Sequence, residues 1–104
     1  MRLYIAGPMT GLPEFNIPAF NAAEAALNAA GFETRNPARH GAGEPGLEWS
    51  DYMRRDIPDL LECDAVALLP GWGASRGATL EVHIAETLGM PVGPLAEWLA
   101  RAAA

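Results

Sequence analysis

The carboxylate of Glu81 is the most informative chemical group in this sequence of 104 residues. Glu81 follows an apolar run at residues 65–69 and a glycine-containing segment at residues 70–77, and it falls early in a predicted helix. Helical spacing places small or apolar neighbours one turn away on either side, namely Gly77, Ala78, Ile84 and Ala85. Because an unpaired buried carboxylate costs free energy, its position on an apolar face indicates a chemical role.

Asp56 and Tyr4 are the residues best suited to act with Glu81. Two carboxylates beside one crevice can cleave a glycosidic bond, one attacking the anomeric carbon while the other donates and accepts a proton. That division requires different pKa values, which burial and hydrogen bonding can supply. Two alternatives stay open from these residues alone. Asp56 could pair with Arg54 or Arg55, and Tyr4 could be an ordinary core aromatic rather than the residue that orients Glu81.

Ser75 and Gly77 stand at the start of the helix that carries Glu81. A hydroxyl, a permissive backbone and unpaired N–H groups at a helix start can bind an anion such as phosphate. Equally, Ser75 could be a simple cap and Gly77 a site of close packing. The segment matches neither a P-loop nor a dinucleotide-binding fingerprint.

Three further side chains are candidates for contact with a ligand. Trp72 and Trp49 could stack on a heterocyclic base or cover the core, and His40 lies in a loop from which it could reach a ligand. Neither His40 nor His83 has a spacing with Cys63 that suggests zinc. We therefore expect no metal, and we expect Cys63 to be a buried structural thiol.

Composition favours one small-molecule-binding domain at residues 1–104. Half of the residues are hydrophobic, and the net charge is −6 without any Lys/Arg cluster, which argues against a nucleic-acid polymer as partner. No charged leader followed by a long apolar segment is evident, so we expect a cytoplasmic protein with no membrane partner.

Alternating strands and helices predict an α/β fold. Strands are expected at residues 3–6, 32–35, 65–69 and 90–93. Helices are expected to start near Asn16, Glu48, Ser75 and Leu95, with Asn16 as a cap and with Pro58 kinking or restarting the second helix. Such βαβ units form a parallel sheet whose ligands bind beyond the carboxyl ends of the strands. This rule gathers the loops at residues 7–13 and 70–77 into one crevice beside Glu81.

The segments Tyr4-Ile5-Ala6-Gly7-Pro8-Met9-Thr10-Gly11, 65–69 and 71–81 together resemble the nucleoside 2-deoxyribosyltransferase superfamily. The closer resemblance is to a small bacterial and phage domain family of unknown function within it, over most of residues 2–93. The resemblance implies a flavodoxin-like, Rossmann-like three-layer sandwich with a four- to five-stranded parallel sheet. It also implies a homodimer or higher homo-oligomer that cleaves the N-glycosidic bond of 2′-deoxynucleosides or their 5′-monophosphates without a cofactor.

The resemblance also assigns roles to residues. Glu81 would be the nucleophile, Asp56 the acid and base, and Tyr4 the residue that holds Glu81. Substrate would be bound by Gly7, Pro8, Met9, Thr10, Gly11, His40, Trp72, Ser75, Arg76 and Gly77. The Ser-x-Gly segment is similar to that of the 2′-deoxynucleoside 5′-phosphate N-hydrolases, where it holds the phosphate.

This chain departs from those hydrolases in its first loop, where Pro8 and Thr10 replace a serine and an arginine. Arg76 is a possible substitute. Nucleoside and nucleotide, and water and a second base as acceptor, therefore all stay open. The alternative function is a non-catalytic nucleotide-binding or sensing module with the same crevice.

Overall fold

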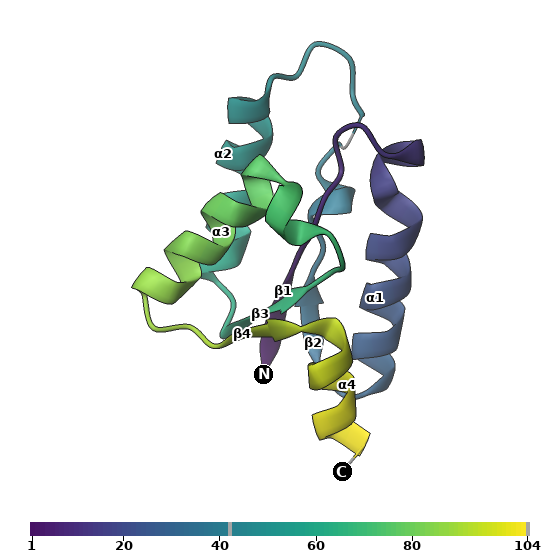
Figure 1. Cartoon of the computed structure of the whole chain (residues 1–104), viewed down its shortest axis with the longest axis vertical. Coiled ribbons are helices and arrows are strands. Elements are labelled where there is room, and N and C mark those ends of the chain that lie inside the picture. The colour runs from purple at the N-terminus through teal and green to yellow at the C-terminus, as the bar shows by residue number, and fades with distance from the viewer. Residues whose placement is uncertain (42, 104) are drawn as a thin grey trace.

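A four-stranded parallel sheet forms the centre of the protein, in a computed structural model that describes residues 1–41 and 43–103 (Figure 1). The strand order is β2-β1-β3-β4. The strands are β1 (Arg2–Ala6), β2 (Glu33–Arg35), β3 (Ala65–Leu68) and β4 (Val92–Pro94). The order and the parallel pairing confirm the predicted flavodoxin-like α/β sandwich, with four strands rather than five.

Helices cover both faces of the sheet and complete three layers. α1 (Ile17–Ala29) and α4 (Leu95–Ala103) lie on one side, and α2 (Trp49–Leu61) and α3 (Arg76–Thr87) lie on the other (Figure 1). Short 3₁₀ turns follow three of the strands, η1 (Pro13–Asn16), η2 (Pro37–Arg39) and η3 (Trp72–Ala74). Among the described residues, none of these helices is both long and apolar enough to cross a membrane.

The core is divided between the two faces because successive strand residues point to opposite sides. Leu3 and Ile5 of β1 pack towards α1 and α4, where the cluster also contains Phe20, Leu27 and Trp98. Tyr4 and Ala6 pack on the opposite face, in a cluster with Leu60, Cys63, Val66, Ala78, Val82 and Ala85. The prediction of a buried thiol at Cys63 is confirmed.

The structure differs from two details of the helix predictions. Asn16 stands at the N-cap position of α1, but its side chain makes no capping hydrogen bond. Its backbone is left-handed, and its side-chain amide donates a hydrogen bond to the Pro8 carbonyl at 3.0 Å. Pro58 does not restart the second helix, since α2 runs unbroken from Trp49 to Leu61. The last strand also begins two residues later than expected, at Val92.

Candidate active site

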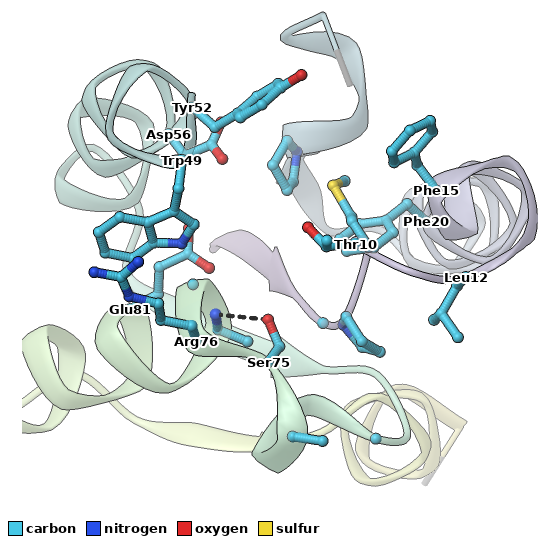
Figure 2. A pocket seen from close by; sticks show the side chains of 18 of the residues that line it. Thr10, Leu12, Phe15, Phe20, Trp49, Tyr52, Asp56, Ser75, Arg76 and Glu81 are labelled. Carbon is cyan, nitrogen blue, oxygen red and sulfur yellow. Dashed lines mark hydrogen bonds between the residues drawn. The ribbon is translucent and has the colours of Figure 1, made fainter. Parts of the chain in front are cut away.

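A cavity of about 760 Å³ opens at the carboxyl ends of β1 and β3. Its walls come from the loops that follow these two strands and from the facing sides of α2 and α3 (Figure 2). The two loops approach closely because Gly7 has no side chain: a Cβ there would lie 2.8 Å from the Cβ of Leu69. The loops after β1 and β3 therefore form the crevice that the sequence predicted. It lies at the carboxyl ends of the strands, where ligands bind in such sheets.

Glu81 projects from α3 into this cavity with only 5% of its surface exposed. The hydroxyl of Tyr4, which is fully buried in β1, donates a hydrogen bond to Glu81 Oε2. Burial raises the pKa of Glu81 to about 8; the hydrogen bond from Tyr4 opposes this rise, and the charge of Asp56 adds to it. Burial and the nearby carboxylates raise the pKa of Tyr4 well above its usual value, so the phenol remains protonated and serves as a donor.

Asp56 reaches the same cavity from α2 and is 8% exposed. Its Oδ1 atom is buried and has no hydrogen-bond partner among the described residues. Arg55, one of the proposed ion-pair partners, instead contacts Glu44 and the carbonyl of His40. Burial raises the pKa of Asp56 to about 7, while His40 and Arg55 lower it and Asp59 raises it.

The first turn of α3 forms the wall next to Glu81. Ser75 caps this helix, its Oγ accepting a hydrogen bond from the backbone N–H of Ala78 at 3.1 Å (Figure 2). The guanidinium of Arg76 lies 3.7 Å from the centre of the Trp49 ring. Gly77 allows α2 and α3 to approach each other, since a Cβ at this position would lie 3.3 Å from Met53 Sδ.

Most of the predicted binding residues line the cavity, namely Gly7, Pro8, Met9, Thr10, Ser75, Arg76 and Gly77. Three do not. Gly11 lies outside the lining, between Thr10 and Leu12. His40 is hydrogen-bonded to Asp59, and Trp72 borders a separate hollow of about 440 Å³ beside α4.

The opposite wall of the cavity was not predicted and is largely apolar. Figure 2 shows Leu12, Phe15 and Phe20 across the cavity from Glu81. Tyr52 and Trp49 line the cavity from α2. Trp49 rather than Trp72 is therefore the tryptophan that borders the cavity. The sequence marked Trp49 as a stacking candidate, but no periodic pattern marked Leu12 or Phe15.

Two buried carboxyl groups in one cavity can divide the tasks of nucleophile and proton donor when only one of them is ionised. Glu81 receives the fixed hydrogen bond from Tyr4, and Asp56 Oδ1 has none. The residues therefore meet the chemical requirements for covalent catalysis at an electrophilic carbon.

Comparisons with known proteins agree with this fold. No curated protein matches the sequence. The solved structure of a 2-deoxyribosyltransferase from the psychrotolerant bacterium Bacillus psychrosaccharolyticus, described as a biocatalyst for nucleoside synthesis, is similar with a TM-score of 0.67 and 20% identity. The similarity covers 88% of this chain and 69% of that one. A family model described as "Domain of unknown function (DUF4406)" matches residues 1–93, and the chain therefore belongs to that family.

Proposed function

We propose that this protein, as a single domain over residues 1–104, cleaves the N-glycosidic bond of a 2′-deoxynucleoside or its 5′-monophosphate. The observation that carries the proposal is the burial of Glu81 and Asp56 in one cavity, with the Tyr4 hydroxyl on Glu81. The shared fold with a 2-deoxyribosyltransferase supports the same reaction class.

In the first step, a carboxylate oxygen of Glu81 forms a bond to C1′ of the deoxyribose. The bond from C1′ to the base nitrogen breaks, and its electron pair stays on the base. Asp56 gives its proton to that base. The product is a deoxyribosyl ester on Glu81 together with a free base, as in retaining glycosidases.

In the second step, an acceptor attacks C1′ and the ester bond to Glu81 breaks. Asp56 takes the proton from the acceptor, which restores both carboxyl groups. Water as acceptor gives hydrolysis, and the nitrogen of a second base gives transfer. Exclusion of water by the incoming base would favour transfer.

The reaction requires one proton on the carboxyl pair, and it must lie on Asp56. The pKa values, about 7 for Asp56 and about 8 for Glu81, leave roughly one proton on the pair near neutral pH. A base nitrogen next to Asp56 favours the protonated form of Asp56, and positive charge developing at C1′ favours the ionised form of Glu81.

A 5′-phosphate is compatible with the start of α3. Arg76 is the one arginine among the described residues that lines the cavity, and its guanidinium contacts an aromatic ring rather than a carboxylate. The first N–H groups of a helix have no partner within the helix and favour anions. Ser75, Arg76 and Gly77 would therefore hold the phosphate of a nucleotide substrate.

To test this proposal, the protein is incubated with a panel of deoxynucleosides and their 5′-monophosphates, and the free base that is released is measured by chromatography. We expect release by the natural protein and loss of release by Glu81→Gln, while Glu86→Gln, an exposed carboxylate on the same helix, should remain active. A deoxyribosyl adduct on Glu81, trapped by rapid quenching, should appear by mass spectrometry. Ligand-dependent thermal stabilisation without release from any substrate would instead support a non-catalytic binding module.

A further inference from the structure

The segment Glu14–Asn16 has a backbone that most residues avoid. Glu14, Phe15 and Asn16 have φ angles of 53°, 53° and 59°, so three consecutive residues other than glycine are left-handed. Asparagine tolerates this region, but glutamate and phenylalanine do so at a cost. Backbone strain of this kind concentrates at functional sites, where the surrounding structure maintains it.

Contacts on both sides hold this segment in place. The Asn16 amide donates to the Pro8 carbonyl at 3.0 Å, which joins the segment to the loop after β1. The Phe15 N–H donates to the Leu12 carbonyl, also at 3.0 Å. On the other side, Gly43 packs against the Phe15 ring, since a Cβ on Gly43 would lie 2.7 Å from Phe15 Cε2.

The strained backbone does not serve to bury Phe15. Phe15 is 43% exposed and belongs to neither core cluster, but it lines the cavity. Figure 2 shows Phe15 across the cavity from Glu81 and Asp56. An aromatic ring held towards a cavity at a conformational cost is suited to contact a ligand.

We propose that Phe15 is a platform on which the heterocyclic base of the substrate stacks, and that the left-handed segment Glu14–Asn16 holds its ring in that position. The proposal rests on the proposed function, because cleavage places C1′ at Glu81 and the base nitrogen at Asp56. The base then extends towards the far wall, where Leu12 and Phe20 accompany Phe15. Stacking uses the π-face that every base has, so this wall accepts purines and pyrimidines.

The first experiment measures KM and kcat for base release by Phe15→Ala, Phe15→Tyr and Leu88→Ala. Loss of one stacking contact should raise KM by about 5- to 150-fold in Phe15→Ala, with kcat changing much less. Phe15→Tyr should stay within about threefold of the natural protein. Leu88→Ala removes an exposed apolar side chain outside the cavity and should change neither constant. Equal KM values for Phe15→Ala and the natural protein would overturn the proposal.

A second experiment needs no turnover. The fluorescent probe 2-aminopurine-2′-deoxyriboside is titrated into Glu81→Gln and into the double variant Glu81→Gln/Phe15→Ala. We expect quenching by stacking in the first protein and a loss of that quenching in the second. This result would support the stacking role of Phe15 even if the natural protein released no base. Equal quenching, or a change of oligomeric state caused by Phe15→Ala in light scattering, would refute it.

Discussion

Replacement of Glu81 by glutamine should stabilise the protein while it abolishes base release. Burial moves the pKa of Glu81 from 4.5 to about 8. The stability that protonated Glu81 confers is therefore complete below pH 4.5 and is lost as the pH rises through 8. From the two pKa values, the free energy of unfolding should fall by an amount on the order of 4 kcal/mol between pH 5 and pH 9. Glutamine is neutral throughout, and its side-chain oxygen can still accept the hydrogen bond from Tyr4.

The assay is urea unfolding of both proteins at several pH values, with the free energy of unfolding taken by linear extrapolation. The stability of Glu81→Gln relative to the natural protein should increase from pH 5 to about pH 8 and then level off. Glu86→Gln, at an exposed position, serves as the control. Its stability relative to the natural protein should change much less with pH, because an exposed carboxylate keeps its hydration when the protein folds. If Glu81→Gln is the less stable protein at pH 9, the inferred cost of the buried charge is wrong.

Three further predictions concern catalysis. Tyr4→Phe keeps the buried ring but removes a hydrogen bond to a charged group, so kcat for base release should fall about 10- to 100-fold without a comparable loss in thermal stability. The plot of kcat/KM against pH should be bell-shaped, rising near pH 7 and falling near pH 8, because the active form of the carboxyl pair holds one proton; a profile flat from pH 6 to pH 9 would contradict this. Because His40 lowers and Asp59 raises the pKa of Asp56, His40→Gln should move the acidic limb to higher pH and Asp59→Asn to lower pH. Shifts of the same sign in both variants would argue against this electrostatic role.

Local patterns were sufficient to predict the sheet and the position of Glu81 on a buried helical face. The continuous apolar run at Ala65–Leu68 is typical of a strand buried on both faces, and it forms β3 next to β1. Parallel pairing then brings the loops after these strands together, which is why the Ser75–Gly77 segment and the loop after β1 share one cavity. Glu81 could be identified because a charge on an apolar helical face contradicts ordinary patterning.

Other parts of the site depend on contacts that sequence periodicity does not encode. The left-handed backbone at Phe15 depends on Asn16 and Gly43, which are distant from each other in the sequence. Similarly, nothing in the loop sequence shows that His40 is engaged by Asp59 of α2. The difference between the two tryptophans has the same origin, because tertiary packing places Trp49 on the cavity and Trp72 on a separate hollow beside α4.

The close packing of α2 against α3 at Gly77 also bears on stereochemistry. Each helix carries one of the two acids, so the approach of the helices sets the separation of the carboxyl groups. Retaining glycosidases hold these groups about 5 Å apart, whereas inverting enzymes separate them by roughly 6.5–9.5 Å to admit a water molecule. A Cβ atom at position 77 would lie 3.3 Å from Met53 Sδ, so a side chain there would press on the α2 side of this contact. In the proposed reaction, the absence of a Cβ atom at position 77 would thus bear on whether the anomeric configuration of the product matches that of the substrate.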